Sequence, residues 1–340
     1  MSSPHISFCI TTYKRGPVLL ATLQSIQKQI FKNFEVIVTD NDTEESGRQF
    51  VNILNDERFK YYPNGKNLGM KPSFNRALSL SSGEYIVMMA DDDPVYPDML
   101  ETLMALKEKH PGYGMYMGGC NWFCEDKDVA NLYNLKIGSN SCLTNKFNLN
   151  HVELFTTSQF LKALFTFNIF SHFLWSTAIV KRSVLDNMGG IPDYGTAFLG
   201  DYAYMSIAST EKGVVIINRA LGHQAMHHEN FGRKQNDQLQ VLTKKFPSYL
   251  QQKLSHVQDW PDIKQIIDRF FGIWITGHLA FIYRYNKANN IIDDSFNLAE
   301  KEVLKSRIVK KYRTKYFLKK YYPKLHDRIV KLKSVRKGKT

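Results

Sequence analysis

Three consecutive acidic residues give the strongest chemical signal in this 340-residue chain. Asp91, Asp92 and Asp93 follow residues 84–90, an apolar run that is typical of a buried strand. Carboxylate oxygens of this kind bind Mg²⁺ or Mn²⁺, and a diphosphate supplies further ligands. Adjacent carboxylates with no basic residue beside them repel one another unless a cation is present. The triplet therefore predicts a divalent metal site, and an acidic turn ended by Pro94 is the open alternative.

The segments around this triplet alternate between strand and helix patterns. Strands are expected over residues 6–13, 34–40, 59–62 and 84–90, and helices over 17–30 and 72–80. Strands separated by helices favour a parallel sheet with right-handed crossovers, in which ligands bind beyond the carboxyl ends of the strands. Polar residues end three of these strands, at 12–13, 40–42 and 91–93. We expect them to meet at one edge of the sheet.

The rest of the chain divides into a less regular part and a helical part. Residues 111–155 show no clear pattern. Further elements are expected at 159–165, 196–210, 235–254, 262–284 and 296–335 (helices) and at 172–180 and 214–217 (strands). The pattern predicts an α/β domain over residues 1–230 and a helical region over residues 231–340.

Four stretches resemble, in order and spacing, the family 2 glycosyltransferases of the GT-A fold. They are residues 6–15, 34–42, 67–86 and 91–97, and the last resembles the DXD-type metal motif of that family. The resemblance covers roughly residues 5–230. It implies a Rossmann-like nucleotide-sugar-binding domain with a mostly parallel central sheet, followed by a C-terminal helical extension.

The resemblance also implies individual roles. The residues that would bind the nucleotide-sugar are Thr12, Tyr13, Asp40, Asn67, Asn75, Arg76 and Asp91. The residues that would bind a divalent cation, Mn²⁺ or Mg²⁺, are Asp92, Asp93, His227 and His228. The Asp40 carboxylate can accept a hydrogen bond from a base N–H. Phe74 stands where many members have an arginine, so Arg76 is the candidate for the missing contact to the diphosphate.

Asp201 is the candidate general base. Inverting members need a carboxylate that removes the proton from the acceptor hydroxyl, and in this family it lies near a helix start. Asp201 lies near the start of the helix expected at 196–210, although Gly200 replaces the second acid of the usual pair. The alternative is structural, because an aspartate in the first helical turn also stabilises the helix.

The net charge of +13 is concentrated at the C-terminal end. Residues 301–340 contain 16 Lys and Arg against two acidic residues, so they carry +14, whereas the first 300 residues are nearly neutral. Apolar residues recur there at roughly helical spacing: Leu304, Ile308, Tyr312, Phe317, Tyr321, Leu325, Ile329 and Leu332. A basic amphipathic helix favours an anionic membrane surface as partner. Nucleic-acid binding and a tail packed on the body are the alternatives.

Two observations argue against an exported or membrane-spanning protein and, together with the basic C-terminal end and the family resemblance, favour a cytoplasmic protein that is peripheral on the inner face of the cell membrane. The first residues lack a charged segment before an apolar run, so no signal peptide is expected. The longest apolar stretch, residues 273–283, is shorter than the roughly 20 residues of a spanning helix.

The expected function is inverting, metal-dependent transfer of a sugar from a nucleotide-sugar, favoured to be a UDP-sugar. The expected acceptor is a hydroxyl of a glycan or lipid-linked glycan in surface polysaccharide synthesis, such as O-antigen or capsule. A nucleotidyltransferase is the first alternative, since it also uses strand-end carboxylates and Mg²⁺. A non-catalytic glycan- or nucleic-acid-binding protein is the second, although no nucleic-acid partner is expected.

Overall fold

The computed structural model describes residues 4–133, 135–143, 147–169, 174–227, 238–326 and 328–329. The chain forms two compact units. The first comprises Met1–Asp193 and Leu199–Asn230, and the second comprises Tyr194–Phe198 and Phe231–Thr340. The short segment Tyr194–Phe198 thus belongs to the helical unit, although it precedes Asp201 by only a few residues.

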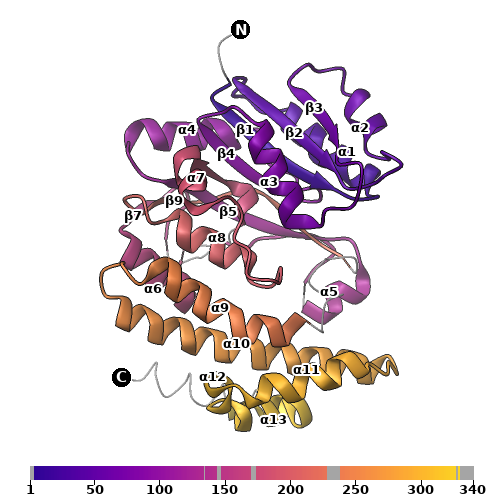
Figure 1. The fold of residues 1–340 in the computed structure, drawn as a ribbon, viewed down its shortest axis with the longest axis vertical. Coiled ribbons are helices and arrows are strands. Elements are labelled where there is room, and N and C mark those ends of the chain that lie inside the picture. The colour runs from indigo at the N-terminus through magenta and orange to yellow at the C-terminus, as the bar shows by residue number, and fades with distance from the viewer. Residues whose placement is uncertain are drawn as a thin grey trace. The chain divides into compact units, whose positions relative to one another are not determined.

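The first unit is built on one nine-stranded sheet (Figure 1). Its strands are β1 (Ile6–Thr12), β2 (Phe34–Asp40), β3 (Phe59–Pro63), β4 (Tyr85–Ala90), β5 (Met115–Cys124), β6 (Gly138–Asn140), β7 (Val152–Phe155), β8 (Ala178–Lys181) and β9 (Val214–Met226). Their order is β3-β2-β1-β4-β8-β5-β9-β7, and β6 pairs with β5. β1 to β4 are parallel, as are β5 and β9. The predicted α/β fold with parallel central strands is confirmed, but β6, β7 and β8 pair antiparallel.

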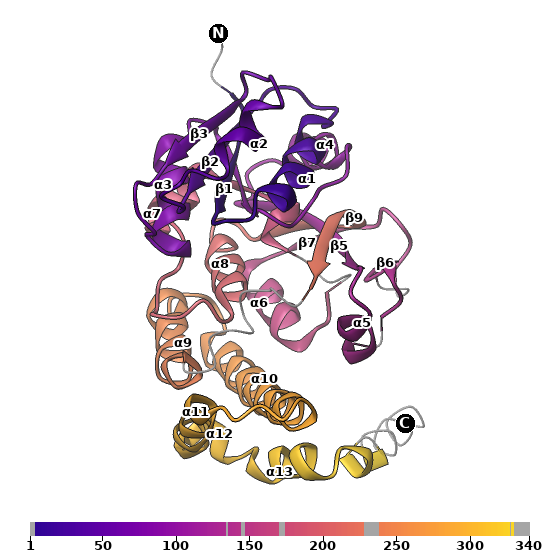
Figure 2. The same ribbon diagram turned by 90° about the vertical axis from the view of Figure 1, so that its right-hand side faces the viewer.

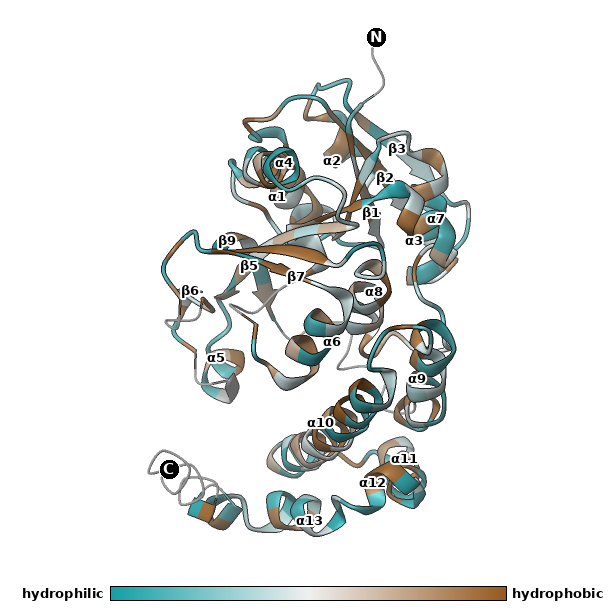
Figure 3. Ribbon diagram, turned by 90° about the vertical axis from the view of Figure 1, so that its left-hand side faces the viewer, coloured by the Kyte–Doolittle hydropathy of each residue, from teal (hydrophilic) through white to brown (hydrophobic). Residues whose placement is uncertain are grey.

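Helices cover both faces of the parallel part of the sheet. Those of the first unit are α1 (Gly16–Gln27), α2 (Arg48–Asn52), α3 (Met70–Leu80), α4 (Met99–Lys109), α5 (Lys127–Tyr133), α6 (Thr157–Thr166), α7 (Arg182–Met188) and α8 (Gly200–Ala208), with the 3₁₀ turn η1 (Trp175–Thr177). Figures 2 and 3 show α1 and α4 on one side of β1–β4, and α3 and α7 on the other. The strands are therefore buried on both faces, which explains their continuous apolar sequences.

The segment without a clear sequence pattern, residues 111–155, contains β5, a ten-residue strand in the interior of the sheet. Gly118 and Gly119 lower the strand propensity of this segment. The structure explains Gly118, because a Cβ atom there would lie 2.5 Å from the Leu221 side chain of β9. The register of β5 against β9 also shifts at these glycines, so the alternation that marks a strand is interrupted. The expected strand at 172–180 begins, within the described residues, only at Ala178.

The second unit is helical. It contains α9 (Leu239–Leu254), α10 (Trp260–Ala288), α11 (Asp294–Lys305), α12 (Arg307–Lys310) and α13 (Arg313–Tyr321). Within the described part of the chain, α10 is the one helix long and apolar enough to cross a membrane, and half of its most apolar segment is buried. The expected apolar stretch 273–283 is thus only part of a longer helix. A buried core helix has the same composition, so this feature is weak evidence for a membrane span.

The basic C-terminal end is partly packed into this unit. Val309 and Tyr316 are buried, and the Tyr312 ring fills the space over Gly272 of α10. Lys320 is also buried: its Nζ lies 2.5 Å from a Glu300 carboxylate oxygen. Of the predicted apolar stripe, Tyr312 therefore packs against α10, beside the buried Val309 and Tyr316, which the prediction did not include.

Other aromatic and apolar residues of this end are exposed, in α13, which is mainly hydrophilic (Figure 3), and in the residues that follow it. Phe317, Tyr321, Tyr322 and Leu325 are exposed, by 45%, 51%, 63% and 49%. We call these four residues and the exposed Lys324 the α13 surface. Leu332 and the other residues after 329 lie outside the described part of the chain.

Candidate active site at the strand ends

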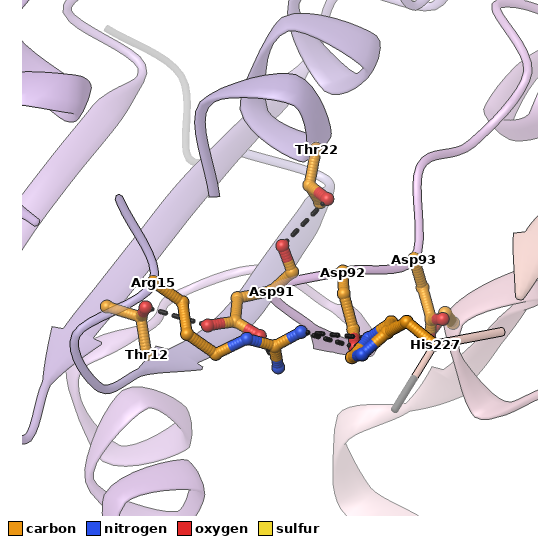
Figure 4. Close-up of polar contacts among 8 residues, drawn as sticks. Thr12, Arg15, Thr22, Asp91, Asp92, Asp93 and His227 are labelled. Atoms are coloured by element: carbon orange, nitrogen blue, oxygen red, sulfur yellow. Dashed lines mark hydrogen bonds and ion pairs between the residues drawn. The ribbon is translucent and has the colours of Figure 1, made fainter. Parts of the chain in front are cut away.

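The ends of β1 and β4 bring the first polar residues together. The two strands are neighbours, and Thr11 pairs with Ala90, so Thr12 and Asp91 leave the sheet side by side. The Thr12 hydroxyl donates to Asp91 Oδ2 over 2.7 Å (Figure 4). Thr22 of α1 donates to the Asp91 carbonyl oxygen over 2.9 Å. Burial raises the pKa of the Asp91 carboxyl to about 6, because desolvation disfavours its charged form.

Asp92 lies between a histidine and an arginine. His227 directly follows β9, and its Nε2 lies 2.9 Å from Asp92 Oδ2. Arg15, in the loop after β1, places Nη1 2.8 Å from Asp91 Oδ1 and Nη2 2.7 Å from Asp92 Oδ2 (Figure 4). Burial alone would raise the pKa of Asp92, but the His227 hydrogen bond and the Arg15 charge lower it below its ordinary value.

Arg15 corrects one premise of the sequence analysis. The aspartate triplet has no basic neighbour in sequence, yet the fold brings a guanidinium to two of its three carboxylates. Mutual repulsion therefore does not by itself require a metal ion here. The sequence does place a basic residue, Arg15, just after the first strand. Nothing in its spacing from the triplet indicates which carboxylate it contacts.

Asp93 has a different environment from Asp92. Its Oδ2 accepts a hydrogen bond from the Ser176 hydroxyl of η1 over 2.9 Å. The carboxyl is buried, and desolvation together with the charge of Asp92 raises its pKa well above the ordinary value. This environment favours a protonated carboxyl that anchors η1. The sequence did not indicate a role for Ser176, because a single serine forms no motif with its neighbours.

The donor atoms at this site fit a metal ion only in part. Over the described residues, no group of three or more His, Cys, Asp or Glu side chains is arranged to hold a metal ion. Asp92 and His227 form a pair, and a carboxylate oxygen with an imidazole nitrogen suits Mn²⁺. The diphosphate of a donor would have to supply further ligands. His228, the other predicted histidine, lies outside the described residues.

Asp40 lies at the end of β2, opposite Thr12 in the register of the sheet. Its carboxylate is fully buried and accepts three hydrogen bonds from the protein. The donors are the Asp42 N–H (2.8 Å), the Gly47 N–H (2.9 Å) and the Tyr61 hydroxyl (2.8 Å). Asp40 thus organises the loop after β2, and its contact with a base stays a prediction. Tyr13 is 46% exposed, so its ring is accessible at the end of β1.

The predicted donor-binding residues around α3 hold neighbouring loops. Asn67 accepts from the Gly69 N–H over 2.9 Å, and Asn75 accepts from the Ile191 N–H over 2.8 Å. Each amide therefore already fixes the backbone near the start of α3 or after α7. Donor binding by Asn67 and Asn75 stays a prediction.

Arg76 is held in the same way, since Nη1 donates to the Pro63 carbonyl over 2.9 Å and to Asn64 Oδ1 over 2.7 Å. Its contact with the diphosphate also stays a prediction. Ser73, which sequence reasoning passed over, joins α3 to the strand ends through hydrogen bonds with Asn64 and Thr39, over 2.9 and 3.0 Å.

Asp201 lies in the first turn of α8, as the sequence predicts. The residue before the helix, Leu199, has a φ of 57°, a conformation that non-glycine residues seldom adopt and that is common at functional sites. Desolvation raises the pKa of the Asp201 carboxyl above its ordinary value. A carboxylate with a raised pKa is a stronger base, so its environment suits proton removal.

The chain is similar in sequence to a family of sugar-transferring enzymes and to individual members of it. The model of "Glycosyl transferase family 2" matches residues 7–189. A GalNAc(5)-diNAcBac-PP-undecaprenol β-1,3-glucosyltransferase of Campylobacter jejuni is 33% identical over 121 residues, which are 34% of this chain and 38% of that protein. A UDP-Glc:α-D-GlcNAc-diphosphoundecaprenol β-1,3-glucosyltransferase of Escherichia coli is 28% identical over 111 residues, 33% of this chain and 44% of that protein. The matches thus span about two fifths of these relatives.

Two solved structures share the fold. TarS (residues 1–349) of S. aureus with UDP-GlcNAc has a TM-score of 0.60 at 15% identity, covering 98% of this chain and 92% of that one. A mannosyltransferase of Pyrobaculum calidifontis with GDP-Man and Mn²⁺ has a TM-score of 0.52 at 17% identity, covering 94% and 85%. At these identities the likeness shows the fold alone.

Proposed function

Because this chain belongs to glycosyl transferase family 2, we propose that it transfers a sugar, with inversion, from a UDP-sugar to a hydroxyl of a lipid-linked glycan in bacterial surface polysaccharide synthesis. The observation that carries the proposal is the meeting of Asp91, Asp92 and His227 at the ends of β4 and β9. Sugar donors of this family carry a diphosphate that binds a divalent cation. Asp92 and His227 offer a carboxylate oxygen and an imidazole nitrogen as further ligands for that cation.

The donor would lie along the ends of β1 and β4. The exposed Tyr13 ring is suited to stack on a nucleotide base, and Thr12, which donates to Asp91, directly precedes it in the chain. The choice of UDP is supported by TarS, which was solved with UDP-GlcNAc, and by the E. coli relative, whose name specifies UDP-Glc.

Asp92 and His227 would hold a divalent cation, Mn²⁺ or Mg²⁺. The bound ion would neutralise the negative charge that develops on the leaving diphosphate. The protein contributes a carboxylate whose pKa is already lowered, so Asp92 is ionised and ready to bind at neutral pH.

Asp201 would act as the general base. The acceptor oxygen forms a bond to the anomeric carbon while the bond from that carbon to the diphosphate breaks, and the hydroxyl proton passes to the Asp201 carboxylate. Attack from the face opposite the leaving group inverts the anomeric configuration. General-base catalysis of this kind contributes about 10²–10⁴ in rate.

Asp201→Asn tests this assignment. We expect UDP-sugar binding to remain, because the substitution preserves shape, while transfer to acceptor falls by about 10²–10⁴. Product analysis should show UDP and the extended glycan. Release of pyrophosphate would instead indicate a nucleotidyltransferase, and undiminished transfer by Asp201→Asn would remove Asp201 as the base.

The acceptor and its location are proposed together. Both glucosyltransferase relatives are named for undecaprenol-linked acceptors, and such lipids lie in a membrane. The α13 surface combines aromatic rings with lysine, and we assign to it peripheral attachment to the anionic inner face of the cell membrane.

The attachment is best tested with point variants. Deleting residues 301–340 would uncover α10 by removing the buried Val309 and Tyr316. Phe317→Ser with Tyr321→Ser should release the protein from anionic liposomes, because both exposed rings are lost. Ile292→Ser, which also removes an exposed apolar side chain but lies outside the α13 surface, is the matched control. Equal liposome binding by all three proteins would refute the assignment.

A further inference from the structure

Arg15 occupies an unusual position for a side chain beside a proposed metal site. Its guanidinium bridges Asp91 and Asp92, and its Nη2 also lies 3.1 Å from His227 Nε2. The side chain is 30% exposed, so it reaches inward from the surface. Lys14, the residue before it, has a φ of 56°, and Arg15 directly precedes α1.

The contacts of Nη2 are made with the two side chains to which we assign the metal. Asp92 Oδ2 and His227 Nε2 are 2.9 Å apart (Figure 4). Two neighbouring ligand atoms of an octahedral ion, each about 2.1 Å from it, are separated by about 3 Å. The pair is thus already spaced as two metal ligands would be. An ion held by both atoms and an Arg15 nitrogen that lies within 3.1 Å of both atoms cannot be present together.

Charge gives the same result as geometry. The guanidinium donates to Asp92 Oδ2, and its Nη2 lies 3.1 Å from His227 Nε2, so it occupies the space beside both atoms that a metal ion would need. It also supplies positive charge to carboxylates that are nearly buried, which reduces the cost of leaving them without another cation. In both respects the guanidinium does what a bound cation would do.

We propose that Arg15 is a positioning residue that takes the place of the divalent cation between Asp92 and His227 and is displaced when the cation binds. The inference rests on the metal-dependent function proposed above. Arg15 keeps the ligand pair assembled in the metal-free enzyme, at the expense of affinity for the free ion. Its second contact, from Nη1 to Asp91, gives the displaced side chain an anchor.

The test is binding of Mn²⁺ alone, without nucleotide, to the full-length protein. Free Mn²⁺ is measured by electron paramagnetic resonance during titration of wild type, Arg15→Gln and Arg15→Lys. We expect Arg15→Gln to bind Mn²⁺ about tenfold more tightly, equivalent to about 1.4 kcal/mol, since no guanidinium has to be displaced. Arg15→Lys should fall between the two, because one ammonium cannot make all three contacts.

Arg58→Gln is the matched control. Arg58 also makes a two-pronged ion pair, with Asp56, and its side chain is 24% exposed. Its loss should lower stability without changing Mn²⁺ affinity. Thermal denaturation adds a second measurement: without Mn²⁺ both glutamine variants should melt lower, and saturating Mn²⁺ should restore stability more in Arg15→Gln than in Arg58→Gln.

The outcomes separate this proposal from the proposed function. Tighter Mn²⁺ binding by Arg15→Gln, or by Arg15→Lys if the first variant does not fold, supports displacement. Mn²⁺ affinity equal to or weaker than wild type would overturn it while leaving the metal site intact, because Arg15 would then only support the ligands. Absence of Mn²⁺ binding by wild type and variants alike, even with UDP present, would overturn the metal site and the displacement together.

Discussion

Asp40 provides a sharp test of the site, because the sequence predicts contact with the donor base whereas the structure shows three internal partners. One carboxylate oxygen accepts from the Asp42 N–H, and the other from the Gly47 N–H and the Tyr61 hydroxyl. Asp40→Asn replaces one of these oxygens by an NH₂ group, which cannot accept. In its better orientation the amide oxygen faces Gly47 and Tyr61, and the NH₂ group faces the Asp42 N–H.

The expected destabilisation follows from these contacts. A buried N–H without its acceptor costs about 1–3 kcal/mol. The two remaining hydrogen bonds lose their charge assistance, which is worth about 1 kcal/mol each. The sum is a loss of about 3–5 kcal/mol in the free energy of unfolding. In a unit of this size, about 1 kcal/mol shifts Tm by about 2–4 °C, so we expect Tm to fall by roughly 6–20 °C.

Thermal and urea denaturation measure this loss, and calorimetric titration with UDP, well below the transition, measures donor binding by the folded protein. Tyr61→Phe is the control, because it removes one of the three donors and leaves the carboxylate; about 1 kcal/mol should be lost. If Asp40 acts mainly on the loop, the folded Asp40→Asn protein still binds UDP. An unchanged Tm with abolished UDP binding would refute the reasoning.

Three further predictions concern pH, packing and the base. Burial opposes ionisation of Glu35, but hydrogen bonds from Lys60 and two serines to its carboxylate lower its pKa. The ionised Glu35 therefore stabilises the folded protein above its unfolded pKa, about 4.3, and this stabilisation is lost as pH falls through the lower folded pKa. Glu35→Gln should thus lower the urea denaturation midpoint relative to wild type, and this loss should be smaller at pH 3 than at pH 6. Gly272→Ala should cost about 1–3 kcal/mol in urea denaturation, since the new Cβ overlaps the Tyr312 ring. Burial raises the pKa of Asp201, so protonation of this base should reduce the kcat of transfer as pH is lowered. The fall in the pH profile of kcat should begin at a pH above the usual carboxyl range.

Sequence reasoning succeeded for the fold where strands are short, apolar and bounded by turns. β1, β2 and β4 are such strands, and they pair parallel in the sheet, as the alternation of strands with helices predicts. It failed at β5, where Gly118 allows Leu221 of β9 to approach closely, and where Gly118 and Gly119 weaken the strand pattern. Glycine at a close approach is a tertiary requirement that a local pattern does not reveal.

The site shows the same division. The predicted topology places Thr12 and Asp91 at the same edge of the sheet, because this requires only the direction of two strands, and the structure brings them into contact. It does not predict that Arg76 donates to the loop after β3, because the reach of a long side chain depends on atoms from several segments. For the same reason Arg15 received no role from its spacing, although it makes the central contacts of the acidic cluster.

These contacts change the interpretation of the charge. The sequence places nearly all of the excess positive charge after residue 300 and describes the strand ends as acidic. In the structure, Arg15 makes ion pairs with Asp91 and Asp92, and burial raises the pKa of Asp93 well above its ordinary value. While Arg15 is in place, the cluster is thus less negative than three aspartates suggest, so a free divalent cation gains less from entering it. A nucleotide diphosphate brings its own negative charge and can pair with the displaced guanidinium, so the metal and the donor should stabilise each other in the site.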